Sequence, residues 1–224
     1  MQIQVSVEPA LERAYPGFAS RFAVVTDINV KKVDGGLEAF KSRTLGELRT
    51  KHGAASITEI PHVVLFRSFF KAMGVDPSRF RSPPEYLLRR ALADRFPSVN
   101  TLVDICLLLT AKHWVTVSAF DAAGLKGRVT MMLAKGSETI QTIDGRTVAL
   151  TPGEIILRDE EKVLSAYTVG DAQATMVTTA TREALVTLWN APGIPEQNLD
   201  ATLAELRTLV AAYTSGVVEE IKPS

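Results

Sequence analysis

The stretch VSAFDAAGLKGRVTMMLAKGSETIQTIDG, residues 117–145, marks the point where the chain changes from helical periodicity to short strands. Apolar and β-branched runs over 115–120, 128–134 and 138–143 are interrupted by Gly124, Gly127 and Gly136. Such runs, bounded by glycine, are typical of strands joined by turns. Asp144-Gly145 stands between two β-prone runs, which predicts a tight hairpin turn. This stretch therefore begins a β-rich half of the molecule.

Downstream of this stretch we expect further strands and one helix. The strands are predicted over 147–150, 154–157, 163–168 and 175–180, with Pro152-Gly153 and Gly170-Asp171 among the breakers. Over about 198–213 leucine recurs at i, i+4 and i+7 spacing, which predicts a final amphipathic helix.

Upstream, helical patterns dominate. Two strands are predicted first, an alternating edge strand over 3–7 and a more buried one over 22–30. Helices are predicted over about 37–51, 63–73, 82–94 and 100–112, the last of them capped by Asn100. In the helix at 82, Ser82 and Glu85 have the spacing of a capping box. The expected core residues of the helix at 63 are Val64, Phe66, Phe69 and Phe70.

These patterns predict one α+β domain over 1–224, helices first and strands after, with 1–60 as a strand and helix extension packed on it. No repeat, low-complexity segment or Pro/Gly/Ser linker divides the chain.

The net charge of the chain limits the classes of partner that we expect. The chain has 25 Lys+Arg and 25 Asp+Glu, so its formal net charge is zero. A zero net charge provides no global field to attract a polyanion, so a nucleic-acid partner must meet a local basic patch.

The sequence contains no short motif for a metal, a phosphate or a covalent nucleophile. His52, His62 and His113 are scattered, which predicts no metal site, and neither a P-loop, a GxGxxG nor a GxSxG is present. The single cysteine, Cys106, lies in an apolar run and is read as a small buried hydrophobe. We expect no cofactor.

The N-terminal residues and the hydropathy of the chain indicate an expected localisation. The first residues show no signal-peptide pattern, and no run of ~18 apolar residues is present that would span a membrane. A lone cysteine fits a reducing compartment. We therefore expect a soluble cytoplasmic protein without a membrane partner.

A longer pattern over residues 75–180 resembles the B3/B4 domain of the phenylalanyl-tRNA synthetase β subunit, particularly its free-standing relatives. GVDPSRFRSPPEYLLRRAL (74–92) is similar to the family's lead into an arginine-containing helix, and FPSVNTLVDICLLL (96–109) to its Asn and Val-Asp segment. Residues 117–145 resemble its Ala-Phe-Asp segment with the following hairpin, and residues 150–181 its closing hairpins. The resemblance covers about half of the chain.

This resemblance implies a three-layer α+β fold with a cleft that, in the synthetase, hydrolyses tyrosine wrongly attached to tRNA. It places six residues at the ligand site: Asn100, Ser118, Phe120, Glu138, Gly170 and Thr175. Two of them depart from the family pattern, because Ser118 replaces a histidine and Thr175 replaces a hydroxyl-binding glutamate. The framework residues Asn100, Asp104, Phe120, Asp121 and Glu138 are kept, so the scaffold is better supported than tyrosine-specific editing.

Two functional hypotheses follow, with a weaker third. The first is a trans-acting hydrolase of misacylated tRNA or a related aminoacyl ester, with Arg81, Arg89 and Arg90 as contacts to RNA phosphates and no DNA partner. The second is a non-catalytic module that binds an amino acid, a nucleoside or RNA in the same cleft. The third is an oligomerising structural protein that uses Trp114, Trp189 and the last helix. Alternative structural roles are capping for Asn100, capping or turn formation for Asp104 and Asp121, and a solvated helix face for the arginines.

Overall fold

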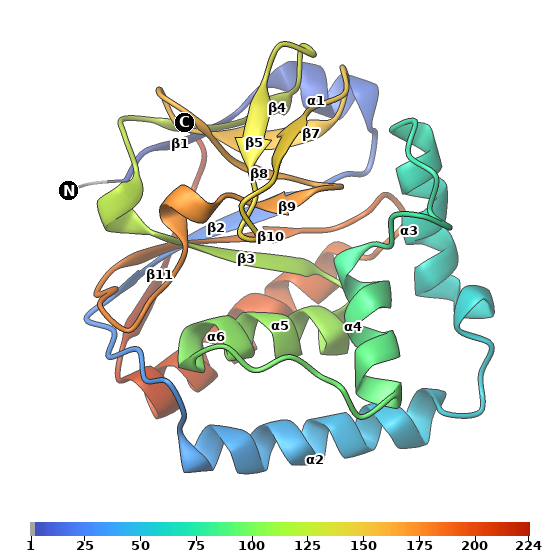
Figure 1. The fold of residues 1–224 in the computed structure, drawn as a ribbon, viewed down its shortest axis with the longest axis vertical. Helices are drawn as coiled ribbons and strands as arrows, with labels where there is room; N and C mark the ends of the chain where they lie inside the picture. Colours follow the sequence, from blue (N-terminus) through green and yellow to red (C-terminus); the bar gives the residue numbers. More distant parts are fainter. Residues whose placement is uncertain (1–2) are drawn as a thin grey trace.

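The computed structural model describes residues 3–224 and arranges their strands in two stacked sheets and one hairpin (Figure 1). The first sheet has the order β1 (Val5–Val7), β4 (Val129–Leu133), β7 (Ile155–Arg158), β8 (Val163–Ala166) and β9 (Gly170–Asp171). The second has the order β11 (Val217–Ile221), β2 (Ser20–Thr26), β10 (Ala184–Trp189) and β3 (Thr116–Asp121). The hairpin joins β5 (Thr139–Gln141) and β6 (Thr147–Ala149). The mixed α+β fold is as predicted, with most strands in the C-terminal half.

Helices cover the second sheet on the side away from the first (Figure 1). Helices α5 (Thr101–His113) and α6 (Glu196–Thr214) contact each other and pack on β3 and β10 respectively. Helix α2 (Gly35–His52) lies against α4 (Pro83–Leu92) and α5. The remaining helices are α1 (Pro9–Ala14), α3 (Pro61–Ala72) and the short turns η1 (Ile57–Glu59), η2 (Ala122–Gly124) and η3 (Gln173–Thr175).

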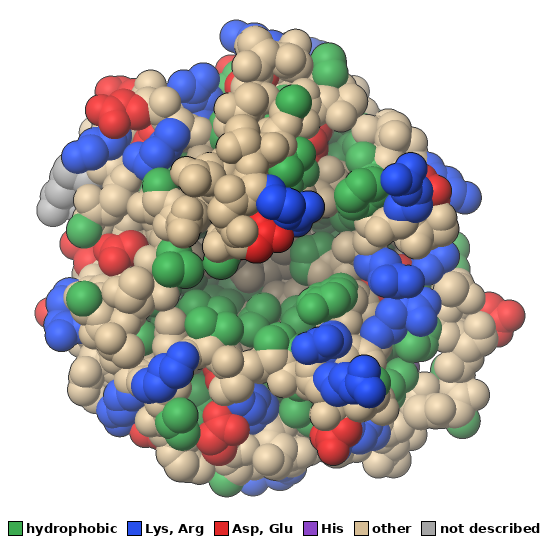
Figure 2. Space-filling view, in the orientation of Figure 1, with side chains coloured by type: hydrophobic (Ala, Val, Ile, Leu, Met, Phe, Trp, Pro, Cys, Tyr) green, Lys and Arg blue, Asp and Glu red, His purple; other side chains and the backbone are tan. Residues whose placement is uncertain are grey.

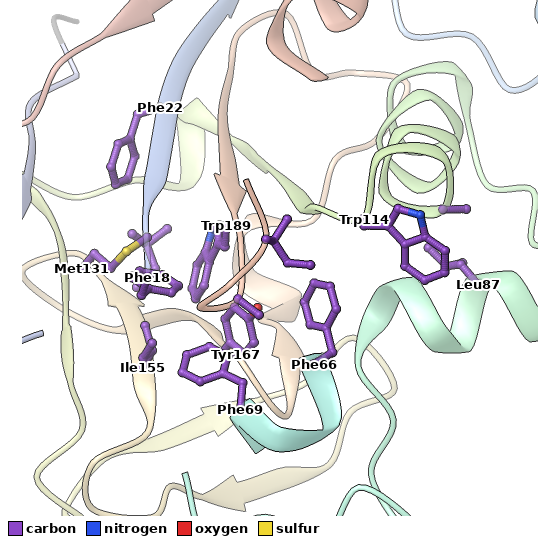
Figure 3. Close-up of a cluster of buried hydrophobic side chains, with 14 of the residues drawn as sticks. Phe18, Phe22, Phe66, Phe69, Leu87, Trp114, Met131, Ile155, Tyr167 and Trp189 are labelled. Atoms are coloured by element: carbon purple, nitrogen blue, oxygen red, sulfur yellow. The ribbon is translucent and has the colours of Figure 1, made fainter. Parts of the chain in front are cut away.

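The main core lies between the two sheets and is closed by α3. Figure 3 shows Tyr167 of the segment after β8 grouped with Phe69 of α3 and Trp189 of β10. The Tyr167 ring centroid lies 5.3 Å from that of Phe69 and 5.4 Å from that of Trp189. A second core, between the second sheet and α5 and α6, contains Leu199, Leu203, Leu206, Leu209 and Val210, as the leucine spacing predicts.

Both tryptophans are buried, which contradicts the hypothesis that they form an interface between copies of this chain. Trp114 is 4% exposed and Trp189 is 1% exposed, so both side chains belong to the interior of this fold. Neither is available for an interface between copies. The Trp189 indole N–H donates to Thr187 Oγ1 at 2.6 Å, which satisfies its polar atom inside the core.

The capping box predicted at α4 is wrong, although the helix starts where expected. The Ser82 hydroxyl makes no capping hydrogen bond, and its oxygen is buried without a partner among residues 3–224. Glu85 turns away from the helix start because Arg67 of α3 offers it a bidentate ion pair, at 2.9 and 2.7 Å. A charged partner from another helix outcompetes a backbone amide for this carboxylate.

The predicted strand over 175–180 is also wrong: that segment holds the end of η3 and a loop. The strand lies a little later, at β10, and every one of its residues is buried. A central strand that is covered on both faces shows no polar alternation, so the usual strand pattern is missing.

Smaller differences from the predictions concern β11, β2 and the helix at 63. The strand β11 was not expected, and the predicted strand over 22–30 ends at Thr26. Val64 is 45% exposed and does not enter the core, whereas Val63 does.

The Asp144-Gly145 hairpin turn is confirmed between β5 and β6, and the edge strand near the N-terminus is confirmed as β1. Within residues 3–224, no helix is long and apolar enough to cross a membrane.

Candidate functional site

A cavity lies where the edges of the two sheets meet above the first half of α5. The cavity has a volume of about 150 Å³ and is walled by α5, the edge strand β3, the edge strand β9 and the η3 segment. Most of its wall is apolar, with Val103, Leu107, Val117 and Val177 among the lining residues. Figure 2 shows a hollow bordered by hydrophobic side chains on this face, with Lys and Arg side chains on one side of it.

A second cavity of about 130 Å³ adjoins the first. It reaches toward α4 and the buried Tyr167, and it shares Leu107, Val117, Ser118 and Asp171 with the first cavity. The mouth of the first cavity carries three unusually exposed apolar side chains: Val99, Ile143 and Met176, which are 40%, 50% and 41% exposed. Together the two cavities offer an apolar space with an apolar rim.

Ser118 and Thr175 both line the first cavity, although 57 residues separate them in the sequence (175 − 118). Ser118 lies on β3, opposite Thr187 of β10, and its position on the edge of the sheet exposes it to the cavity. Thr175 ends η3 and is 1% exposed, and its hydroxyl has no hydrogen-bond partner among residues 3–224. A buried hydroxyl without a partner is costly, so it is available for a ligand or a water molecule.

Asn100 does not line the cavity, but it fixes two of its walls. Its Oδ1 accepts from the Val103 backbone N–H at 3.1 Å, which caps α5 as predicted. Its Nδ2 donates to the Val177 carbonyl at 3.1 Å, across 77 residues of sequence. Asn100 thus ties the start of α5 to the loop that follows η3, and its side chain is a structural element of the site.

The Asp121 carboxylate holds the loop on the opposite side. One oxygen accepts from the Ala123 backbone N–H at 3.0 Å and starts η2, while the other accepts from the Thr181 hydroxyl at 2.6 Å. Gly124, which ends η2, packs so closely on η3 that a Cβ there would lie 2.8 Å from the Ala174 carbonyl oxygen. The Phe-Asp-Ala-Ala-Gly segment therefore acts as the support for Thr175.

Asp104 also supports the walls of the cavity. Its carboxylate accepts from Lys41 Nζ at 3.0 Å, from the Ser98 hydroxyl at 2.9 Å and from the Val99 backbone N–H at 2.7 Å. Both charged side chains are buried. This ion pair joins α2 to α5 and fixes the segment that carries Val99 at the cavity mouth.

Asp171 is a cavity residue that the sequence analysis treated only as a chain breaker. It lies on β9 opposite Ser165 of β8, lines both cavities and is partly exposed. Enclosure by the surrounding protein raises the pKa of its carboxyl above the usual range, while interactions with the Ser165 and Ser118 hydroxyls oppose this shift. The sequence signal at this position is only the Gly170-Asp171 pair, which is typical of a break between strands.

Three of the six predicted ligand residues line the cavities: Ser118, Gly170 and Thr175. Phe120 is fully buried in the core between the sheets and lines neither. Glu138 also lies away from them, where one carboxylate oxygen accepts the backbone N–H groups of residues 135, 136 and 137. Asn100 lines neither cavity, but its two hydrogen bonds hold the start of α5 to the loop after η3.

The predicted RNA-contact arginines lie on and before α4, whose Pro83 and Leu87 line the second cavity. Arg81 is exposed, whereas Arg89 forms an ion pair with Glu85 at 3.0 Å. The Arg90 guanidinium lies over the exposed Tyr86 ring, 5.8 Å from its centroid. Arg79 and the exposed Phe80 form a similar pair at 6.0 Å. This segment therefore combines arginines with exposed aromatic rings.

Neither a metal nor a thiol nucleophile is indicated by these groups. Over the described range 3–224, no cluster of three or more His, Cys, Asp or Glu side chains is placed to hold a metal ion. Cys106 lines the first cavity, but burial raises the pKa of its thiol to about 12. At neutral pH this sulfur is a thiol and not the nucleophilic thiolate.

The family model described as "B3/4 domain" matches residues 65–199, which is more than half of the chain. The chain belongs to the B3/4 domain family. Strands β2 and β11 lie outside the matched range, yet both belong to the same sheet as β3.

The individual relatives are β subunits of phenylalanine–tRNA ligase. The chain is 32% identical over 109 residues to that of Bradyrhizobium diazoefficiens and 30% identical over 108 residues to that of Fusobacterium nucleatum. Each match covers 48% of this chain but 14% of the relative. The chain thus corresponds to a small part of these subunits.

A solved structure extends the similarity to the whole chain. The N-terminal fragment of the phenylalanyl-tRNA synthetase β subunit from Pyrococcus horikoshii superposes with a TM-score of 0.54 at 14% identity. The match covers 100% of this chain and 55% of that fragment. At this identity the likeness shows the fold alone.

Proposed function

We propose that this protein hydrolyses an aminoacyl ester carried by tRNA, with the amino acid side chain held in the cavity between β3, β9 and α5. The observation that carries the proposal is that Ser118 and Thr175, which come from distant parts of the sequence, line one apolar cavity. An apolar protein cavity of about 150 Å³ is large enough to accept benzene, so a ring or branched side chain fits this volume.

The chemistry requires positioning more than a strong nucleophile. Water attacks the ester carbonyl carbon, the bond from that carbon to the ribose oxygen breaks, and the ribose oxygen takes up a proton. The products are a free amino acid and an uncharged tRNA. Ser118 and Thr175 would orient the water and the carbonyl, because an ester is already activated and gains from fixed geometry and polarisation.

The arginine-bearing segment before and within α4 would contact RNA. Arg81 and Arg90 lie in the segment whose Pro83 and Leu87 line the second cavity, and Phe80 and Tyr86 offer exposed rings for unpaired bases. The formal net charge of zero leaves this local patch as the source of phosphate affinity. We therefore expect weak, salt-sensitive binding of tRNA.

One observation favours a second function, the binding of an amino acid or nucleoside without catalysis. Ser118 stands where the resembled editing site has histidine, and among residues 3–224 no histidine lines either cavity. The site therefore lacks an imidazole base, the most common general base in enzymes.

The two functions are separated by incubating the protein with tRNAs carrying tyrosine, serine or phenylalanine and measuring ester loss above the buffer rate. Hydrolysis by the wild type, and a loss of at least tenfold in Ser118→Ala or Thr175→Val, supports catalysis in this cavity. Ser137→Ala is the matched control, because Ser137 is exposed on the loop before β5. Saturable binding of a free amino acid without any hydrolysis would instead support the binding module.

The RNA contacts have their own readout. Arg81→Ala and Arg90→Ala should slow hydrolysis of the aminoacyl-tRNA but leave hydrolysis of the same aminoacyl ester of adenosine unchanged. Equal losses on both substrates would contradict a role in RNA binding.

A further inference from the structure

Asp171 lines both cavities. It is one of four residues common to both linings, and the other three are Leu107, Val117 and Ser118. Among these four only Asp171 carries a charge. On its own sheet it faces Ser165, and on the neighbouring sheet Ser118 stands beside it. A ligand that fills both cavities would therefore contact Asp171.

In the described part of the chain, the cavity walls offer this carboxylate no positive charge. Over residues 3–224, neither lining includes a Lys, Arg or His side chain. Two other buried carboxylates do have such partners, Glu85 with Arg67 and Asp104 with Lys41, whereas the buried Glu154 accepts hydrogen bonds from Thr168. A charge enclosed in an apolar site is costly unless it is paired, so Asp171 is the one cavity group that gains most from a cationic ligand.

We propose that Asp171 binds the protonated amino group of the ligand, so that this site selects compounds with a free amine over N-acylated or deaminated analogues. The partly exposed Asp171 keeps the access that a ligand needs. With the ammonium at Asp171, the Ser118 hydroxyl in the same wall would be available to the adjacent carbonyl, and the apolar walls formed by Val103 and Val117 would receive the side chain.

This inference deepens the proposed function and, as far as it concerns esters, rests on it. It names the substrate class as α-amino acid derivatives with an unblocked amine. The recognition of the amine is nevertheless a property of binding, so it is measurable without any hydrolysis.

The experiment measures equilibrium binding by isothermal titration calorimetry to the full chain. The probes are amino acid amides with small, branched and aromatic side chains, each paired with its N-acetyl and its deaminated counterpart. The wild type should bind at least one amide about tenfold or more tightly than both counterparts, as expected for a hydrogen-bonded charge pair. Asp171→Asn should abolish this preference, and Ser137→Ala should keep it.

The pH profile gives a second, independent readout. Protonation of Asp171 should weaken binding of the amide as pH falls, beginning at a higher pH than for an ordinary aspartate. The other titratable groups that line the cavities are Cys106 and Tyr167, whose pKa values are raised by burial, and both stay neutral in that range. The acidic limb should therefore vanish in Asp171→Asn.

Three outcomes overturn the proposal: equal affinity for free and blocked amines, no saturable binding of any amide, or a preference that survives in Asp171→Asn. Failure of the proposed function looks different. If the esters are not hydrolysed but the amine preference stands, only the catalytic role is lost. If blocked and free aminoacyl esters are hydrolysed equally, the catalytic role stands and the amine recognition is lost.

Discussion

Replacing Glu85 by Gln removes a single negative charge from the junction of α3 and α4. The wild-type carboxylate is 0% exposed and accepts three charge-assisted hydrogen bonds, from Arg67 Nε at 2.9 Å, Arg67 Nη2 at 2.7 Å and Arg89 Nε at 3.0 Å. Burial alone would raise the pKa of Glu85, but the two guanidinium groups outweigh it and hold the pKa below the usual range. Glutamine has nearly the same shape, so the variant isolates the charge.

The size of the effect follows from the burial of the three side chains. Breaking a buried ion pair by removing one partner costs about 3–5 kcal/mol. The arginine side chains are 24% and 34% exposed and can turn toward water, so we expect the lower end, about 3 kcal/mol. For a domain of this size, that loss lowers Tm by about 6–12 °C.

The assay is thermal and urea unfolding of the wild type, Glu85→Gln and Arg89→Ala at pH 7. Arg89→Ala is the matched control, because it removes only the partly exposed i,i+4 contact and should cost about 0.5 kcal/mol. The folded-state pKa of Glu85 is lowered, so its contribution is present above the unfolded pKa and is lost as pH falls through the folded pKa. The difference between wild type and Glu85→Gln should therefore shrink in acid. A cost no larger than that of Arg89→Ala, or one independent of pH, would refute the reasoning.

Three further predictions concern the cavity. Asn100→Ala should lower the free energy of unfolding by about 2 kcal/mol, since it removes both the α5 cap and the donor to the Val177 carbonyl, and Asn100→Asp should cost less because it keeps the cap. Equal costs would contradict the cap, and an Asn100→Asp variant as stable as the wild type would contradict the cross-link to Val177. Cys106 should resist alkylation by iodoacetamide at pH 7.5 until the protein is unfolded, because its thiol has a pKa raised to about 12; stoichiometric labelling of the native protein within minutes would contradict this. Asp171→Asn should raise Tm relative to wild type more at pH 7 than at pH 4. The pKa of Asp171 is raised in the folded state, so the wild type loses stability as this carboxyl ionises. The same Tm difference between variant and wild type at both pH values would contradict this prediction.

Where the local pattern is strong, the sequence predicts this fold well. The leucine spacing of α6 agrees with its buried face, and Asp144-Gly145 forms the expected hairpin turn, because both signals depend on neighbours within a few residues. Asn100 was correctly predicted as the cap of α5 for the same reason. Its second bond, to Val177, has no local signal, since the partner lies 77 residues away.

The errors share one cause, the influence of distant segments. Glu85 has the spacing of a capping box, but Arg67 provides a stronger partner once α3 packs against α4. Strand β10 lies between β2 and β3, so both faces are buried and no alternation remains to mark it.

The sequence by itself determined the α+β class, most of the helices, the neutral charge and the similarity to the synthetase domain. The resemblance also predicted Ser118 and Thr175 as ligand-site residues, and both line one cavity in the folded chain. Only the tertiary structure decided that Phe120 belongs to the core and that Asp171 lines both cavities. The physical reason is that Asp171 is distinguished by the absence of Lys, Arg and His side chains from the cavity walls that residues 3–224 form. Such an absence is defined by which segments surround a residue in space, and no local sequence pattern records it.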